Sequence, residues 1–185
     1  MRTKADIHKN IIEACKQGNE VARYQLYQLY AKAMFNISYR MMNHREEAED
    51  MLQVAFTQAF MKMESFRYES SFGSWLKRIV VNTCINEMNR RKVDLTYCDE
   101  IYSEKIIDEN DDYESEYTVQ NVTRALEQLP DGSRMVFSLY LLEGYDHGEI
   151  AEILNISEST SKSQYMRAKR RVAEILKTEN KRNKI

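Results

Sequence analysis

Very few residues in this chain interrupt a helix. Its 185 residues include 5 glycines and 1 proline, the residue types that most often break helices and form turns. Strand-type alternation of apolar and polar residues is absent, whereas apolar residues recur at steps of three and four. Together these features predict an all-helical fold. The length allows one domain of ordinary size or two small ones.

Apolar periodicity and capping residues define the expected helices. They cover about residues 7–16, 19–42, 43–64, 72–92, 122–129 and 130–144, followed by a helix pair at 145–171. Asn19 is placed to cap the second of these helices, and Asn43 with Glu46 forms a candidate capping box for the third. The helix at 72–92 is apolar on two opposite sides, which is typical of the central helix of a bundle.

One flank of the helix at 43–64 carries a strip of polar and aromatic residues. Asp50, Gln53, Thr57 and Phe60 fall on this flank and the outer side, while Phe56 falls on the apolar face. A carboxylate and an amide beside an aromatic ring are reasonable components of a protein-contact surface. A solvated flank with a half-buried Phe60 is the alternative.

Residues 145–171 have the pattern of a helix-turn-helix. Asp146 and Glu149 form a candidate capping box at the start of the first helix. Asn155 tolerates the left-handed backbone that ends a helix, and Ser157 is placed to cap the second helix. A compact pair of helices joined by a tight connection is therefore expected here.

The second helix of this pair has a polar and basic outer face. Its inward row is apolar except at Ser161, and its outward row carries Ser159, Lys162, Ser163, Met166, Arg167 and Arg170. Hydroxyl and amide groups can read base edges in a DNA major groove, while lysine and arginine bind phosphates or guanine. The pattern favours DNA binding, and an ordinary helical hairpin with a solvated basic face is the alternative.

The net charge of −2 hides an uneven charge distribution. Residues 93–118 contain ten acidic residues and one basic residue, so this segment carries −9 and the rest of the chain +7. The segment lacks strong periodicity, and we expect an acidic flexible linker at 94–117. It would join one domain at 5–93 to a second at 118–178.

The composition argues against several other classes of protein. Cys15, Cys84 and Cys98 are scattered without a CxxC motif, and the 3 histidines are isolated, so no metal site is expected. The cysteines are expected to act as small apolar residues in a reducing cytoplasm. No catalytic constellation is visible, which predicts a non-enzyme without cofactor or small-molecule substrate. Neither a signal peptide nor a membrane span is apparent, which predicts a cytoplasmic protein.

Two long blocks carry a family resemblance. The first, at 47–92, reads EAEDMLQVAFTQAFMKMESFRYESSFGSWLKRIVVNTCINEMNRRK, and the second, at 126–172, reads LEQLPDGSRMVFSLYLLEGYDHGEIAEILNISESTSKSQYMRAKRRV. The first resembles region 2, and the second region 4, of extracytoplasmic-function (ECF) RNA polymerase sigma factors. Their order and the acidic segment between them also match that family. The resemblance implies a factor that binds core polymerase and directs promoter-specific transcription initiation.

The resemblance also implies roles for individual residues. Docking on the beta-prime clamp helices of core polymerase would involve Asp50, Gln53, Phe56 and Phe60. Capture and melting of the minus-ten element would involve Arg67, Ser70, Ser71, Trp75, Asn82, Asn86 and Arg90. Recognition of the minus-thirty-five element would involve Thr160, Lys162, Ser163, Gln164, Met166, Arg167, Lys169 and Arg170. Val54 stands where an acidic residue is usual, and Gln164 stands where an arginine is common.

Further partners follow from the same resemblance. They are the beta flap of core polymerase, promoter DNA and an anti-sigma factor. The main alternative is a stand-alone helix-turn-helix repressor or activator with an N-terminal sensor bundle. The strip on the helix at 43–64 and the loop at 67–74, which resembles the family's strand-capture loop, together disfavour that alternative. An enzyme acting on nucleic acid is disfavoured because no catalytic cluster is visible.

Overall fold

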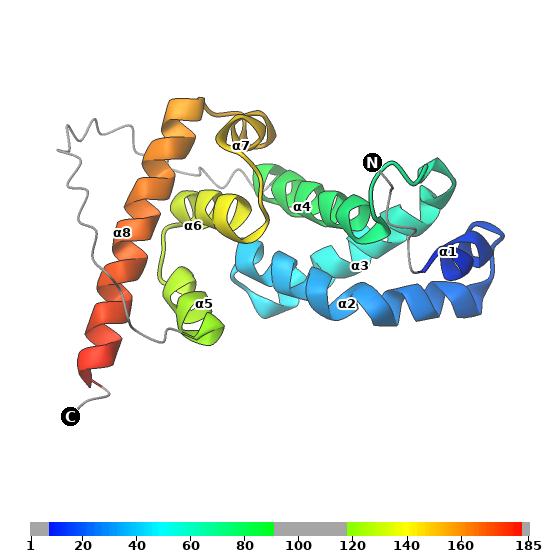
Figure 1. The fold of residues 1–185 in the computed structure, drawn as a ribbon, viewed down its shortest axis with the longest axis horizontal. Helices are drawn as coiled ribbons and strands as arrows, with labels where there is room; N and C mark the ends of the chain where they lie inside the picture. The colour runs from blue at the N-terminus through cyan, green and yellow to red at the C-terminus, as the bar shows by residue number, and fades with distance from the viewer. Residues whose placement is uncertain (1–7, 91–117, 183–185) are drawn as a thin grey trace. The chain divides into compact units, whose positions relative to one another are not determined.

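The computed structural model describes residues 8–90 and 118–182 (Figure 1). The chain divides into two compact units between Val93 and Asp94. Unit 1 below means residues 8–90, and unit 2 means residues 118–182, which are the described parts of the two compact units. Every regular element in these two ranges is helical, so the predicted all-helical fold is confirmed. The predicted linker at 94–117 lies outside the described residues.

Unit 1 is a helical bundle. Its elements are α1 (Lys9–Lys16), α2 (Glu20–Met42), α3 (Arg45–Met61), the 3₁₀ helix η1 (Met63–Ser65) and α4 (Phe72–Arg90). Helices α2, α3 and α4 each pack against the other two, and α1 lies against α2. Helix α4 buries Leu76 and Val80 on one side and Val81 and Ile85 on the other. The prediction that α4 is apolar on two opposite sides is thus confirmed.

The connection between α2 and α3 differs from the sequence prediction. Asn43 does not cap α3; it ends α2 in a left-handed conformation with φ 54°, and its N–H donates to the Tyr39 carbonyl at 2.8 Å. His44 precedes α3 and makes no capping hydrogen bond with its side chain. Asparagine suits either kind of helix end, but one residue cannot be left-handed and extended at once. By contrast, Asn19 caps α2 as predicted, accepting from the Ala22 N–H at 3.0 Å.

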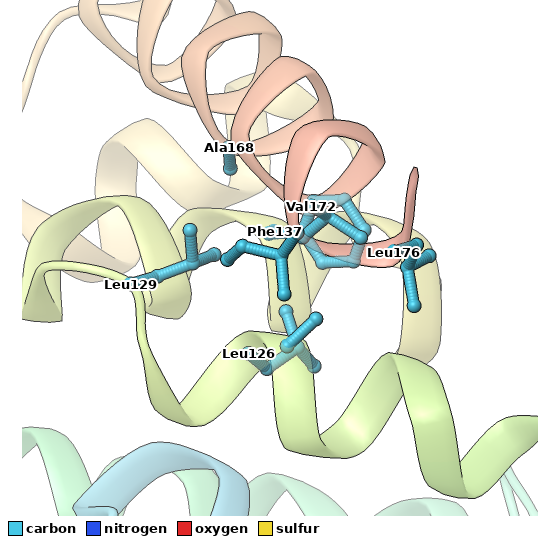
Figure 2. Close-up of a cluster of buried hydrophobic side chains, with 8 residues drawn as sticks. Leu126, Leu129, Phe137, Ala168, Val172 and Leu176 are labelled. Carbon is cyan, nitrogen blue, oxygen red and sulfur yellow. The ribbon is translucent and has the colours of Figure 1, made fainter. Parts of the chain in front are cut away.

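Unit 2 is a second helical cluster with its own core. Its elements are α5 (Val119–Glu127), α6 (Asp131–Phe137), the π-helix η2 (Ser138–Leu142), α7 (His147–Leu154) and α8 (Glu158–Arg182). Figure 2 shows side chains of α5, α6 and α8 meeting in this core, which comprises Ala125, Leu126, Leu129, Phe137, Ala168, Val172, Ile175 and Leu176. Helix α8 continues a few residues past the predicted domain end at residue 178. Burying one such large apolar side chain stabilises the unit by about 1.5–3 kcal/mol.

The segment predicted as one helix from 130 to 144 changes its winding midway. After Phe137 the backbone becomes a π-helix, with the Glu143 N–H bonded to the Ser138 carbonyl at 3.0 Å. Gly144 then ends the segment at φ 77°, as its position predicted. The wide turn leaves Leu141 and Leu142 exposed on unit 2.

Candidate nucleic-acid interface

Helices α7 and α8 form the predicted helix-turn-helix. Asp146 accepts from the Glu149 N–H at 2.8 Å, and the Glu149 carboxylate accepts from the Asp146 N–H at 2.9 Å. Asn155 ends α7 with φ 53°, and the Ser157 hydroxyl accepts from the Thr160 N–H at 3.0 Å to cap α8. Each predicted capping interaction of this motif is therefore confirmed. Together they fix the direction in which α8 leaves α7.

The polar residue in the inward row of α8 has a partner that the sequence pattern did not reveal. Ser161 is fully buried, and its hydroxyl lies 2.9 Å from Nδ1 of His147. The His147 ring stacks on Tyr140, with ring centroids 4.3 Å apart. Tyr165 contacts the Tyr140 ring at 4.5 Å. These contacts tie η2, α7 and α8 together, so Ser161 closes the motif rather than weakening it.

The outer face of α8 presents polar and basic groups to solvent. Exposed side chains include Lys162, Ser163, Met166, Lys169 and Arg170, and Thr160 and Arg167 are partly exposed. Lys162 pairs with Glu158 at 2.6 Å, and Arg170 lies 3.4 Å from Glu174. Exposed pairs of this kind contribute little to stability, about 0–1 kcal/mol. Phosphates could therefore replace these glutamates at little cost.

Gln164 is not on this outer face, contrary to its place among the predicted DNA-contacting residues. Its side chain is 3% exposed, and its Oε1 accepts a hydrogen bond from the Ser133 hydroxyl at 2.7 Å. This bond joins α6 to α8 inside unit 2. A buried side chain with a committed acceptor cannot read a base edge without being pulled from the core. Gln164 is therefore a packing residue in this structure.

The loop before α4, residues 67–71, is the candidate strand-capture loop and is called the capture loop below. Arg67, Ser70 and Ser71 are exposed on it. Rings of buried Phe66 and Phe72 hold its two ends, with centroids 5.5 Å apart. Ser71 also caps α4, accepting from the Ser74 N–H at 3.2 Å. The loop thus exposes polar groups from a rigid aromatic base.

A stripe of side chains continues from this loop along α4. Trp75, Arg78, Asn82 and Asn86 recur at steps of three and four, and Asn89 and Arg90 follow Asn86 at three and four residues. Trp75 is partly exposed and the others are exposed. The predicted minus-ten residues of α4 thus lie on one side of the helix with Arg78 and Asn89, and these six residues are called the α4 stripe below. Arg78 and Asn89 were not among the predicted site residues, although the same helical spacing placed them there.

Helix α3 carries the predicted docking surface. Asp50, Gln53 and Thr57 are exposed and Phe60 is partly exposed, and these four residues are called the α3 strip. Phe56 is buried, as its periodicity predicted, and its ring lies 5.8 Å from that of Phe60. Phe56 therefore supports the strip from beneath. A hollow of about 380 Å³ between α2 and α3 is lined in part by Gln53.

Two cysteines lie within the described ranges, and both are buried as expected of small apolar residues. Burial raises the pKa of Cys84 to about 12 and also raises the pKa of Cys15. The reactive thiolate is thus disfavoured at both positions. Within residues 8–90 and 118–182 no group of acidic, histidine or cysteine side chains could hold a metal ion. None of the helices there is long and apolar enough to cross a membrane.

Unit 2 contains a helix-turn-helix, and unit 1 is a second helical unit with polar surfaces on α3 and α4. Together they define a two-unit protein of the helix-turn-helix class. Residues 26–93 match the family described as Sigma-70 region 2, and residues 120–172 match Sigma-70, region 4. The ECF RNA polymerase sigma factor SigM of Mycobacterium tuberculosis is 31% identical over 90% of this chain and 83% of its own length. SigW of Bacillus subtilis is 28% identical over 87% of this chain and 92% of its own length.

A solved structure of similar fold is also a sigma factor. The sigma factor RpoE of Bartonella quintana, in complex with the anti-sigma factor NepR, aligns with a TM-score of 0.54 and 26% identity. The alignment covers 83% of this chain and 96% of that one. The chain belongs to the ECF RNA polymerase sigma factors.

Proposed function

We propose that this sigma factor docks on core polymerase through α3 and uses both of its units to place the polymerase at promoters. Unit 1 would capture the melted minus-ten strand on the capture loop and the α4 stripe. One observation carries this proposal: the residues of the α4 stripe follow one another along one side of the helix from its loop end to Arg90, and all are exposed or partly exposed. A single strand needs such a continuous surface, with cations for its phosphates and a ring on which a base can stack. Trp75 supplies the ring, and Arg67, Arg78 and Arg90 supply cations.

The energetics of strand capture are compatible with this surface. Extruding a base from the duplex costs a few kcal/mol of stacking and pairing. Stacking of one base on an aromatic side chain returns about 1–3 kcal/mol. Hydroxyls and amides of Ser70, Asn82 and Asn86 can replace hydrogen bonds that the base and its neighbours lose. The protein acts by binding, and the polymerase performs the chemistry.

Core polymerase would contact both units. The α3 strip offers Asp50 and Gln53 on the same flank of the helix as the supported ring of Phe60, which suits docking on the beta-prime clamp helices. Val54, 42% exposed beside the strip, adds an apolar group to this surface. On unit 2, exposed Leu141 and Leu142 are the candidate contact for the beta flap. Docking of both units raises the effective concentration of each unit at its own DNA element.

Unit 2 would read the minus-thirty-five element through the outer face of α8. The residues offered are Thr160, Lys162, Ser163, Met166, Arg167, Lys169 and Arg170. Gln164 is left out because Ser133 and the core hold its side chain. Ser163 and Met166 are the exposed groups best suited to base edges and thymine methyls, and the cations suit phosphates or guanine. The protein would work in the cytoplasm, where an anti-sigma factor would hold it inactive.

The test is run-off transcription on pooled genomic DNA with core RNA polymerase, with and without this protein. Discrete new transcripts that require both components are expected, and their start sites would give both promoter elements. A variant with Asp50→Ala and Gln53→Ala should lose these transcripts. Absence of core binding and of new transcripts, with duplex DNA still bound, would instead favour the stand-alone repressor or activator.

A further inference from the structure

Helix α1 contacts the capture loop, although 55 residues separate the two contact positions. The hydroxyl of Tyr68, in the loop, donates a hydrogen bond to Oε1 of Glu13 on α1 at 2.5 Å. The Tyr68 residue is partly buried, and the Glu13 side chain is 45% exposed. Tyr68 is the residue of the loop that turns inward, while its neighbours Arg67, Glu69 and Ser70 are exposed. The loop is therefore held to the body of unit 1 at its middle.

Lys16 reinforces this contact from one turn further along α1. Its Nζ lies 3.2 Å from Oε1 of Glu13 and 4.6 Å from the centroid of the Tyr68 ring. It also lies 6.0 Å from the centroid of the Phe66 ring, just before the loop. Both the Tyr68 hydrogen bond and the Lys16 cation lower the pKa of Glu13. Glu13 is therefore charged at neutral pH, where it is the stronger acceptor.

The backbone of Tyr68 explains why the loop requires such a contact. Tyr68 has φ 60°, in the left-handed region that bulky residues rarely occupy. A conformation of this kind persists only where surrounding contacts hold it. The hydrogen bond to Glu13, the Lys16 cation and the Phe66 ring at 4.7 Å provide those contacts. Without them the loop would gain other conformations.

Helix α1 is anchored well enough to act as a support. Ile12 and Cys15 are 0% and 2% exposed, and both lie in the core of unit 1. A second route starts at His8, whose ring lies 5.7 Å from Tyr30, which in turn lies 5.2 Å from Phe72 at the start of α4. The residue that precedes α1 is therefore connected to the base of the loop through Tyr30 of α2.

We propose that Glu13, Lys16 and Tyr68 form a clamp by which α1 holds the capture loop ready for the minus-ten strand. These are positioning residues, which act through the exposed side chains of the loop. Holding the loop in one conformation before binding removes an ordering cost that the captured strand would otherwise have to offset. The clamp rests on the proposed strand capture and gives α1 a role in that step.

The clamp can be tested with holoenzyme assembled from core polymerase and full-length variants. The probe is a fork-junction DNA with a single-stranded minus-ten segment, taken from a promoter mapped by run-off transcription, compared with the same promoter as duplex. Tyr68→Phe keeps the ring and removes the hydroxyl, and Glu13→Ala removes the acceptor. Each should weaken fork binding by about 3- to 10-fold, the worth of one hydrogen bond, with core binding unchanged.

Three further comparisons separate positioning from general destabilisation. The double variant should bind the fork no more weakly than Glu13→Ala alone, since Glu13→Ala already removes the bond that Tyr68→Phe removes. Glu13→Gln retains an acceptor oxygen and should recover most of the affinity. Tyr24→Phe is the matched control, because it deletes an exposed hydrogen bond to Gln28 on α2 and should leave fork binding unchanged. Amide exchange of residues 67–71 should accelerate in the clamp variants alone.

Three outcomes would overturn the proposal, and they can be told apart. If the wild-type holoenzyme shows no preference for the fork, strand capture by this chain fails and the clamp fails with it. If the wild type prefers the fork and Tyr68→Phe and Glu13→Ala bind it equally well, the clamp alone is rejected. Additive losses in the double variant would likewise show that the two residues act separately.

Discussion

At the scale of single residues, Gln164 separates a structural role from a DNA-reading role. Gln164→Ala removes the acceptor of the buried Ser133 hydroxyl. We expect it to lower the free energy of unfolding of unit 2 by about 1–3 kcal/mol without changing promoter preference. Exposed Ser163 offers the matched comparison: Ser163→Ala should leave stability unchanged and alter the affinity for the minus-thirty-five element. Denaturant unfolding and promoter binding measure the two effects.

The opposite pattern is equally informative. If Gln164→Ala shifted base preference and left unfolding unchanged, the glutamine would have to leave the interface between α6 and α8 when DNA binds. The Ser133 bond would then be a feature of the free protein only.

Glu13 gives a prediction about pH. The pKa of its carboxyl is lowered, first by the Tyr68 hydrogen bond and then by Lys16. Because the pKa of Glu13 is lower in the folded protein, the charged carboxylate contributes its full stabilisation of the folded state at pH values above the ordinary pKa of 4.5. This stabilisation is lost as the pH falls through the lower, folded value. Carboxyl chemical shifts should show this low midpoint in the wild type and a higher one in Tyr68→Phe. Equal midpoints would mean that the hydrogen bond does not form in solution.

At the scale of elements, the α3 strip should carry core-polymerase affinity. Asp50→Ala and Gln53→Ala remove exposed polar groups without opening a cavity, so the thermal midpoint should stay within the range of ordinary surface changes. Their affinity for core polymerase should fall by about 1 kcal/mol or more each, as at interface anchors. Gln25→Ala on the exposed side of α2 is the control. Loss of affinity in the control as well would show that the docking surface extends beyond α3.

Most helix ends could be predicted because their signals are local. The caps at Asn19, Asp146 and Ser157 depend on residues within one turn, and each forms as expected. Asn43 was assigned to the wrong helix because asparagine suits a left-handed ending as well as a cap. The π-helix at Ser138–Leu142 was missed because apolar periodicity scarcely distinguishes it from an α-helix over a single turn.

The contacts that sequence could not supply join residues far apart in the chain. Helical spacing correctly placed Ser161 and Gln164 on α8, yet it could not show that His147 and Ser133 would pair with them. Gln164 was absent from the outward row that spacing predicted for α8, and it entered the set of DNA-contacting residues only through the family resemblance; its burial corrects that assignment. The α3 strip was predicted from spacing within one helix, whereas the minus-ten residues on α4 followed from the family resemblance. The residues of both sets are exposed or partly exposed, apart from Phe56 beneath the strip.

At the scale of the whole molecule, each unit has its own core and should unfold by itself. Leu126→Ala opens a cavity in unit 2 and Leu76→Ala opens one in unit 1, each at a cost of about 2–5 kcal/mol. Trp75 is the single tryptophan of the chain and lies in unit 1. Its fluorescence therefore follows unit 1 alone, while far-ultraviolet circular dichroism follows the helices of both units.

Leu126→Ala should shift part of the circular dichroism transition to lower temperature and leave the tryptophan transition in place. This variant should still assemble with core polymerase through α3, yet lose transcription from promoters that depend on the minus-thirty-five element. Leu76→Ala should shift the tryptophan transition and abolish assembly, because the α3 strip rests on the core of unit 1. A tryptophan transition that moved with Leu126→Ala would show that the two units stabilise each other. Recognition of the two promoter elements would then depend on contact between the units as well as on the separate surface of each unit.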